Sequence, residues 1–213
     1  MEFDRVATTT RSVRKRLDLT RPVPRQLLSE CLEVALQAPS ASNRQPWHFL
    51  FLDDPEPKKV VAAAYRKAFR HYLKEAAGLG GTGWDGGDPR AQSQAAVADS
   101  AMHLVQVLHR VPVLVLPCIQ GSPQGLSEHA LAAHYGSILP AAWSLMLALR
   151  SRGLASAWTT LHVMYAEEVA EALGIPPGWT QACLIPVAYP LGGDFAAARR
   201  LPVPMVSSWN GWK

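Results

Sequence analysis

One uninterrupted apolar segment limits the folds that this chain can adopt. Residues 112–119 read Pro-Val-Leu-Val-Leu-Pro-Cys-Ile and contain no charged, amide or hydroxyl side chain. That length suits a β-strand and falls far short of the roughly 20 residues that a membrane-spanning helix needs. A strand that is apolar at every position has to be covered on both of its faces. The segment therefore predicts a central strand that is buried on both sides.

A second apolar stretch predicts a deeply buried helix. Residues 134–152 have helical spacing, with an apolar stripe made of Ile138, Leu139, Ala142, Leu145, Met146 and Leu149. Trp143 and Leu147 lie off that stripe, so the helix is apolar all round and we expect it to lie between layers or between subunits. Pro140 has no N–H to donate, so we expect the helix to start or to kink there.

The remaining pattern mixes helices and strands. Apolar spacing and stop signals predict helices over about 24–36, 59–77, 94–109 and 167–173, and strands over 47–52, 158–160 and 181–189. Pro186 in the last strand indicates an edge or a bulge. This order is typical of α+β or α/β folds, and residues 1–213 suit a single domain. The glycine-rich residues 78–90 predict a mobile flap that carries Trp84.

Composition excludes several classes of protein. The chain is 48% hydrophobic and 18% charged, which suits a buried core rather than a disordered protein. The net charge of +4 is spread along the chain, so we expect a few phosphate-binding arginines and no nucleic-acid partner. Cys31, Cys118 and Cys183 lack metal-binding spacing, so we expect no metal site. No apolar signal opens the chain, so we expect a cytoplasmic protein without a membrane partner.

Three polar stretches are candidates for a site, and each also has a plain structural explanation. Residues 10–16 form either a solvated basic face or a helical turn on which Arg11 and Arg14 converge on one phosphate. Residues 38–47 are either a proline-bounded turn or a polar edge for a flat heterocycle. Residues 153–162 are either a plain core strand or a run of small residues that a ligand approaches closely.

These stretches carry a resemblance to a known family. Residues 11–14 read Arg-Ser-Val-Arg, and after one helix residues 38–49 read Ala-Pro-Ser-Ala-Ser-Asn-Arg-Gln-Pro-Trp-His-Phe. The chain thus resembles the FMN-dependent nitroreductase family, whose pattern is Arg-Ser-x-Arg followed by Ala-Pro-Ser…Asn-x-Gln-Pro-Trp-x-Phe. Residues 153–160 resemble that family's Gly-Leu-Gly-Ser-x-Trp-x-Thr segment, with Ala155 where glycine is common. The resemblance covers the chain from Arg11 to about Pro202.

The resemblance implies a set of FMN contacts. The phosphate and ribityl chain would be held by Arg11, Ser12 and Arg14, with Arg199 and Arg200 closing over the phosphate. The second subunit of a homodimer would supply Pro39, Ser40, Ala41, Asn43 and Gln45. The flavin ring would lie against Trp158, Thr159 and Thr160, and main-chain N–H groups near Thr159 and Thr160 would bond to it. Ala198 stands where the family often has a further basic residue, so phosphate binding depends more on Arg11 and Arg14. Arg199 and Arg200 also have a plain alternative, a solvated pair.

The implied fold is an α+β nitroreductase-like fold in an intertwined homodimer. Its centre would be a mostly antiparallel sheet of four or five strands flanked by helices. Trp209 and Trp212 are too apolar for a free tail, and we expect them to pack on the partner subunit.

The implied activity depends on the cofactor, because the chain offers no paired carboxylates and no nucleophile with a base. No catalytic residue is therefore assigned. We expect an FMN-dependent NAD(P)H oxidoreductase in which NADH or NADPH reduces the flavin and leaves. A nitroaromatic, quinone or similar electron-poor acceptor then takes the electrons at the same place, in a ping-pong mechanism. Alternatives on the same scaffold are a reductive dehalogenase, a flavin-degrading enzyme or a protein that stores FMN.

Overall fold

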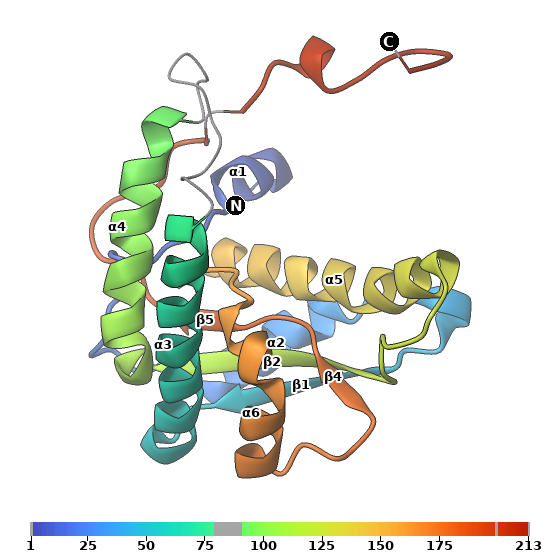
Figure 1. Ribbon diagram of the computed structural model, residues 1–213. Helices are drawn as coiled ribbons and strands as arrows, with labels where there is room; N and C mark the ends of the chain where they lie inside the picture. The colour runs from blue at the N-terminus through green and yellow to red at the C-terminus, as the bar shows by residue number, and fades with distance from the viewer. Residues whose placement is uncertain (1, 79–90, 199, 213) are drawn as a thin grey trace.

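A five-stranded antiparallel sheet forms the centre of the computed structural model (Figure 1), which describes residues 2–78, 91–198 and 200–212. The strands are β1 (Trp47–Leu52), β2 (Val113–Gln120), β3 (Ala155–Ser156), β4 (Trp179–Gln181) and β5 (Ile185–Ala188). Their order is β1-β2-β5-β3, and β4 also pairs with β2, next to the end of β5. All of these pairs are antiparallel, so the predicted α+β class and sheet are confirmed.

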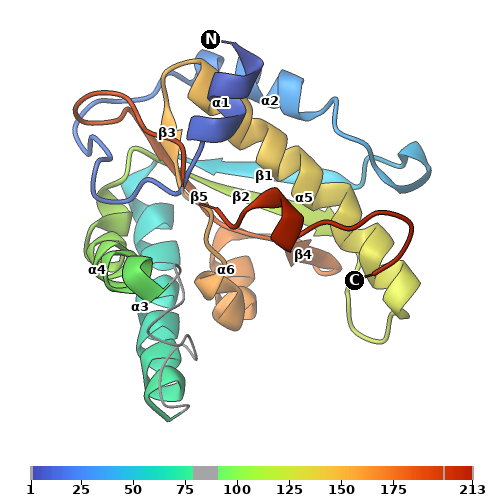
Figure 2. The same ribbon diagram turned by 90° about the horizontal axis from the view of Figure 1, so that it is seen from above.

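Helices cover the sheet on both faces (Figures 1 and 2). They are α1 (Phe3–Thr9), α2 (Arg25–Ala35), α3 (Pro55–Gly78), α4 (Ala91–Val107), α5 (Glu128–Ser151) and α6 (Ala166–Leu173). Short 3-10 turns lie at Ala41–Asn43, Leu108–Arg110, Leu161–Tyr165 and Val203–Met205. Helices α2 and α5 pack on one face of the sheet, and α3, α4 and α6 pack on the other.

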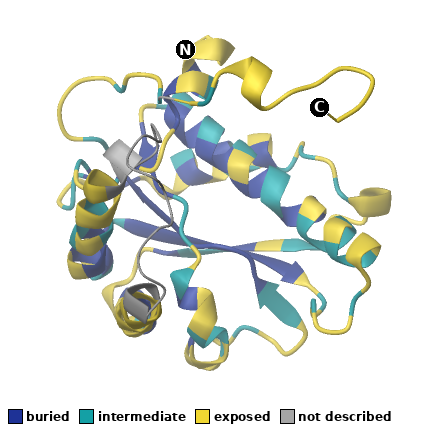
Figure 3. Ribbon diagram, turned by 45° about the horizontal axis from the view of Figure 1, so that its top comes forward, coloured by how far each residue is buried: buried dark blue, intermediate teal, exposed yellow. Residues whose placement is uncertain are grey.

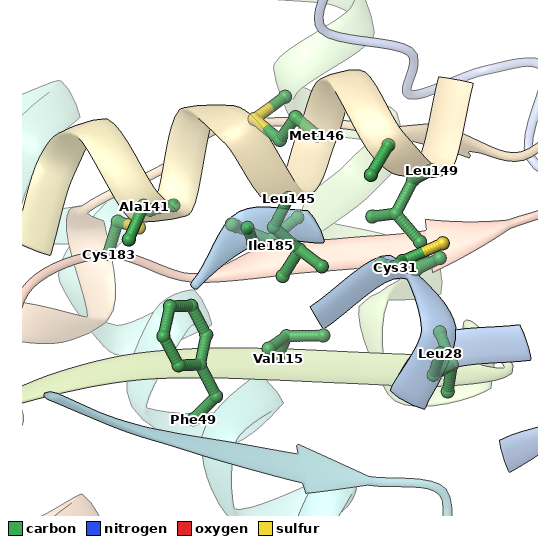
Figure 4. Close-up of a cluster of buried hydrophobic side chains, with 14 of the residues drawn as sticks. Leu28, Cys31, Phe49, Val115, Ala141, Leu145, Met146, Leu149, Cys183 and Ile185 are labelled. Atoms are coloured by element: carbon green, nitrogen blue, oxygen red, sulfur yellow. The ribbon is translucent and has the colours of Figure 1, made fainter. Parts of the chain in front are cut away.

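Strand β2 lies in the middle of the sheet and is buried on both faces, as predicted. Val115 belongs to the cluster under α5, together with Phe49, Leu145 and Ile185 (Figure 4). Leu116, the next residue, belongs to the opposite cluster between the sheet and α3 and α4. Side chains alternate between the faces of a strand, so an all-apolar strand supplies both layers at once. Figure 3 shows the resulting buried sheet between partly exposed helices.

Helix α5 differs from the prediction at its start. It begins at Glu128, where the Ser127 hydroxyl oxygen accepts the N–H of Ala130 at 3.3 Å. Pro140 therefore lies inside the helix, so the helix does not start at this proline, and the alternative of a kink there stays a prediction. By length and composition alone, α5 is long and apolar enough to cross a membrane. Buried core helices share these properties, and one face of α5 packs on the sheet.

The last predicted strand is interrupted in the structure. Residues 182–184 separate β4 from β5, so residues 181–189 do not form one strand. Strand β5 lies between β2 and β3, so Pro186 is not on an edge strand. The Pro186 carbonyl oxygen accepts the N–H of Ala157 at 3.3 Å. The strand predicted at 158–160 is also replaced, since β3 contains only Ala155–Ser156.

Two predictions concern parts of the chain outside the sheet and its covering helices, namely the glycine-rich flap and the C-terminal segment. Residues 79–90, most of the predicted flap with Trp84, lie outside the described residues. Near the C-terminus, Trp209 is 87% exposed and Trp212 is fully exposed. Their packing on a partner subunit stays a prediction.

One buried polar side chain makes the fold sensitive to acid. His162 is fully buried in the turn that precedes α6, and neither ring nitrogen has a hydrogen-bond partner among the residues that the structure describes. Burial disfavours the imidazolium and lowers the pKa of His162 from 6.5 to about 4. As the pH falls, the His162 imidazole is therefore protonated in the unfolded chain before it is protonated in the folded protein.

We predict that the free energy of unfolding falls as the pH drops from 6.5 towards 4, because protons then bind the unfolded chain in preference. The contribution of His162 is fully present above pH 6.5. Its loss amounts to about 3 kcal/mol once the pH is below both pKa values. Urea denaturation of wild type and His162→Leu between pH 7.5 and 4 measures it.

The His162→Leu variant should show a flatter pH dependence, since it removes the titrating group. His48→Leu, which changes an exposed histidine, is the matched control and should keep the wild-type slope. An identical slope in His162→Leu and wild type would show that another group causes the acid sensitivity.

Candidate functional site

The segment that carries Arg11, Ser12 and Arg14 lies alongside strand β3. Ser12 pairs with Ser156 in a parallel bridge, and the N–H of Val13 donates to the Ser156 carbonyl oxygen at 2.8 Å. Helix α1 ends at Thr9, and the pairing of Ser12 with Ser156 is strand-like, so this segment is not helical. The prediction of a helical turn is therefore wrong. The segment is nevertheless held against the start of the predicted small-residue stretch.

The two arginines of this segment have different partners. Arg11 Nη1 donates to the carbonyl oxygen of Ala196 at 3.1 Å, whereas Arg14 Nη1 donates to Ser100 Oγ in α4 at 3.2 Å. Residues three positions apart in an extended chain point to opposite sides. Arg11 therefore faces the C-terminal segment, and Arg14 faces the α3–α4 layer.

Arg14 is a half-buried cation without a carboxylate partner. Burial lowers the pKa of its guanidinium below the ordinary value, and Tyr65 is the only group that opposes this effect. No Asp or Glu in the described part of the chain pairs with Arg14. A charge that is removed from water is stable when it is paired or hydrogen-bonded. This position therefore favours an anionic ligand.

Tyr65 of α3 interacts electrostatically with Arg14 and is hydrogen-bonded to Thr159, one of the predicted ring contacts. Thr159 Oγ1 donates to the Tyr65 hydroxyl oxygen at 3.0 Å, and Tyr65 is only 2% exposed. Burial raises the pKa of Tyr65, so its hydroxyl stays protonated. Sequence reasoning missed Tyr65, because a tyrosine on an apolar helix face reads as a core residue. No sequence signal marks its contact with Thr159.

The backbone N–H and carbonyl groups of Thr159 are already hydrogen-bonded to Leu184. Its N–H donates to the Leu184 carbonyl oxygen at 3.1 Å, and the Leu184 N–H returns a bond of 2.7 Å. The Thr159 N–H is therefore not available for a flavin ring. The N–H of Thr160 has no partner among the described residues, and Trp158 packs against the cluster under α5.

An ionic cluster around Asp194 fastens the C-terminal segment beside Arg11. The Asp194 carboxylate binds Arg5 of α1 and Arg150 of α5, and accepts the N–H of Phe195 at 2.9 Å. The hydrogen bond from Arg5 is the main reason that the pKa of Asp194 lies far below its usual range, and that from Arg150 comes next. Asp194 thus holds two cations that sequence reasoning did not place at the site.

The predicted C-terminal arginines follow this cluster closely. Arg200 lies four positions after Ala196, whose carbonyl oxygen accepts from Arg11. The structure therefore brings the chain near Arg200 to the same side of the molecule as Arg11. Arg199 lies outside the described residues.

Residues 38–46, the part of the predicted stretch that precedes β1 and is called the 38–46 segment below, have an unusual backbone. Ser42, Asn43 and Gln45 have φ angles of 52°, 52° and 50°. These left-handed conformations are uncommon for residues other than glycine and concentrate at functional sites. The segment holds itself in place, because the Ser40 hydroxyl oxygen accepts the N–H of Gln45 at 3.0 Å and Gln45 Nε2 donates to Asn43 Oδ1 at 3.3 Å.

This segment lies at the opposite end of α5 from the arginine segment (Figure 2). The N–H of Ala41 donates to Ser137 Oγ at 3.0 Å, whereas Arg150 Nη2 donates to Thr9 Oγ1 at 3.1 Å. Ser137 and Arg150 are 13 positions apart in one helix, which corresponds to about 20 Å. One chain therefore does not bring the predicted contacts at Pro39–Gln45 together with those at Arg11–Arg14.

The three cysteines are not candidates for reactive groups. All are buried, and burial raises the pKa of Cys31 to about 11, that of Cys118 to about 12 and that of Cys183 further. The thiols stay protonated at neutral pH. Within the described ranges no group of three His, Cys, Asp or Glu side chains has the arrangement to hold a metal ion.

Several known proteins are similar to this chain in sequence or in fold. A "NADH dehydrogenase" from Thermus thermophilus is 30% identical over 89% of this chain and 87% of its own length. A "4-nitrobenzoate reductase" from Nocardioides sp. is 26% identical over 88% of this chain and 80% of its own. An iodotyrosine deiodinase, solved with FMN and 3-iodo-L-tyrosine, aligns with a TM-score of 0.75 at 22% identity over 99% of this chain and all of that chain. The model of the nitroreductase family matches residues 7–189, and the chain therefore belongs to that family.

Proposed function

We propose that this protein is an FMN-dependent NAD(P)H oxidoreductase that reduces nitroaromatic, quinone or similar electron-poor acceptors. The observation that carries the proposal is Arg14, a half-buried cation that lacks a carboxylate and lies beside Tyr65. Family membership, the relatives named as an NADH dehydrogenase and a 4-nitrobenzoate reductase, and the FMN in the deiodinase structure support it.

The residues at this end of α5 fit the chemical groups of FMN. A phosphate dianion needs cations that are not already neutralised, and Arg14 is one. Among the described residues, Arg11 donates to a backbone carbonyl oxygen and to no carboxylate, so it keeps further N–H groups. Arg5 and Arg150, in contrast, are paired with Asp194. The amide of Thr160 has no backbone partner among the described residues, so it could donate to an acceptor atom of the ring.

We further propose that the protein acts as a homodimer in which each FMN lies between subunits. The two sets of predicted contacts lie at opposite ends of α5, and Trp143, midway between Ser137 and Arg150, is 42% exposed. A two-fold axis near Trp143 would place two α5 helices side by side and antiparallel. It would bring Ser40 and Asn43 of one subunit to Arg14 of the other.

The exposed stripe of α5 suits such a contact. Ala132, Gly136 and Trp143 lie at spacings of four and seven and are all exposed, so they form one face of the helix. Small residues allow close approach of two helices, and Trp143 supplies apolar area. The exposed Trp209 and Trp212 of the C-terminal segment add further apolar surface for a partner.

When bound, FMN supplies the redox chemistry, since it takes up a hydride equivalent from NADH or NADPH and passes electrons to an acceptor. The residues of this chain would hold its phosphate and lie against its ring. Donor and acceptor would reach the ring at the same place in turn, so we expect ping-pong kinetics. A reductive dehalogenase remains the second candidate, because the deiodinase has a TM-score of 0.75.

We predict that the protein, purified or reconstituted with FMN, is yellow and that NADH or NADPH bleaches its flavin absorbance without oxygen. Addition of a nitroaromatic or a quinone should then restore the absorbance, and 3-iodotyrosine tests the dehalogenase alternative. A protein that takes up no FMN contradicts the whole proposal. FMN binding without bleaching by either nucleotide would instead indicate a storage protein.

We predict that Arg14→Ala raises the Kd for FMN about 30-fold, because one charge-assisted phosphate contact contributes about 2 kcal/mol. Arg200→Ala should weaken binding in the same direction. Flavin fluorescence titration of the apoprotein measures both. Arg110→Ala changes an exposed arginine in the turn that precedes β2; it is the control and should bind like wild type. Unchanged affinity in Arg14→Ala and Arg200→Ala would show that the phosphate binds elsewhere.

We predict that Trp143→Glu shifts the protein from dimer to monomer and also reduces FMN retention. A carboxylate at the centre of the α5 contact would face its own copy across the axis, and like charges repel. Sedimentation equilibrium and the flavin-to-protein absorbance ratio measure the two effects. Tyr72→Glu changes an aromatic side chain on α3 that is 48% exposed and should change neither. A Trp143→Glu protein that stays dimeric would rule out this axis.

A further inference from the structure

A large cavity adjoins the 38–46 segment at the N-terminal end of α5. Its volume is about 770 Å³, within the range of small-molecule sites. Apolar atoms dominate its wall, which includes Ile119 of β2 and Ala130 and Ala133 of α5. Of the predicted FMN contacts that the structure describes, only Ala41 lines this cavity. The cavity therefore has room for a further molecule beside the segment that reaches the partner's cofactor.

The charged lining of this cavity is positive. Arg44 lines it, and no Asp or Glu does. Arg44 forms no ion pair within the described part of the chain. The first turn of the 24-residue helix α5 also borders the cavity, and the N-terminal end of a helix carries partial positive charge. An uncompensated arginine beside apolar wall suits a ligand with an anionic group on an apolar body.

A second polar group in the wall lacks a partner. His134 Nε2 is buried and has no hydrogen bond to any described residue. Its ring is held edge-on against Tyr135, with centroids 5.1 Å apart, and its Cε1 would lie 3.6 Å from a Cβ at Gly121. Because the protein encloses this nitrogen, a ligand in the cavity would contact it only after the wall rearranges. His129 also lines the cavity and is exposed.

We propose that this cavity binds the electron acceptor and that Arg44 selects acceptors with a carboxylate on an aromatic ring. The proposal rests on the function proposed above, since the cavity meets a flavin only if the 38–46 segment reaches the partner subunit. The ring would contact the apolar wall, and the carboxylate would pair with Arg44. Arg44 is then a specificity-determining residue outside the FMN contacts.

The test compares two acceptors of nearly the same shape that differ in charge, 4-nitrobenzoate and 4-nitrobenzamide. Wild type should have the higher kcat/KM for 4-nitrobenzoate. Arg44→Gln should lower kcat/KM for 4-nitrobenzoate about 10-fold, the scale of one charge-assisted contact, and change that for 4-nitrobenzamide less than about 2-fold. Arg44→Lys should recover part of the loss, and Arg110→Gln should match wild type. Equal losses with both acceptors, or no preference in wild type, would overturn the proposal.

An anionic group on the nucleotide donor is the other source of negative charge, and separate half-reactions distinguish it. Stopped-flow reduction by NADH and by NADPH should be unchanged in Arg44→Gln, while reoxidation by 4-nitrobenzoate is slowed. The reverse result would assign Arg44 to the nucleotide and contradict the proposal. Equal flavin content in variant and wild type shows that FMN binding is intact.

A binding measurement separates failure of this inference from failure of the proposed function. If wild type reduces neither acceptor, the oxidoreductase proposal fails, but benzoate and benzamide still test the cavity. Calorimetric titration of the purified protein should give tighter binding of benzoate, and Arg44→Gln should remove that difference. Equal affinities for benzoate and benzamide in wild type would overturn the assignment of Arg44 whether or not the enzyme turns over.

Discussion

The structure depends on the need to cover strand β2 on both faces. Because β2 is apolar at successive positions, Val115 requires one helical layer and Leu116 requires another. Helix α5 supplies much of the first layer and spans 24 residues. Its length separates the arginine segment from the 38–46 segment by about 20 Å. The requirement for a buried strand thus also decides that one subunit holds only half of the predicted cofactor contacts.

Pairing of charges separates structural arginines from candidate ligand arginines. Arg5 and Arg150 lie close to the arginine segment, but both are paired with Asp194, which fastens the C-terminal segment. Arg14 lies nearby in partly buried surroundings without a carboxylate. Arg44, at the other end of α5, is similarly unpaired among the residues described. Removal of water makes an unpaired charge costly, so an anion would stabilise the half-buried Arg14, whereas Arg44 is exposed and stays hydrated.

Pairing between residues far apart in the sequence explains why two sequence predictions are wrong and why Tyr65 was missed. Spacing predicted that Arg11 and Arg14 share a helical turn, and propensity predicted a strand at residues 158–160. In the structure, pairing of Ser12 with Ser156 keeps the arginine segment extended, and the bridge between Thr159 and Leu184 replaces a regular strand. These pairings join residues far apart in sequence, and no local pattern encodes them. Tyr65 was missed for the same reason, because its hydroxyl meets Thr159 only in the folded chain.

The sequence by itself determined the class of fold, the central strand at residues 112–119, strand Trp47–Leu52 and the family, since these follow from apolar periodicity and from motifs of fixed spacing. It also determined the candidate residues, including Arg14 and Asn43. Only the tertiary structure decided which of them lie together. It placed Arg11–Arg14 beside Ser156 and put Ser40 and Asn43 at the other end of α5. It also identified Arg44 as a cation on a cavity wall. Burial, pairing of charges and separation along a helix are properties of three-dimensional packing, and a one-dimensional pattern does not contain them.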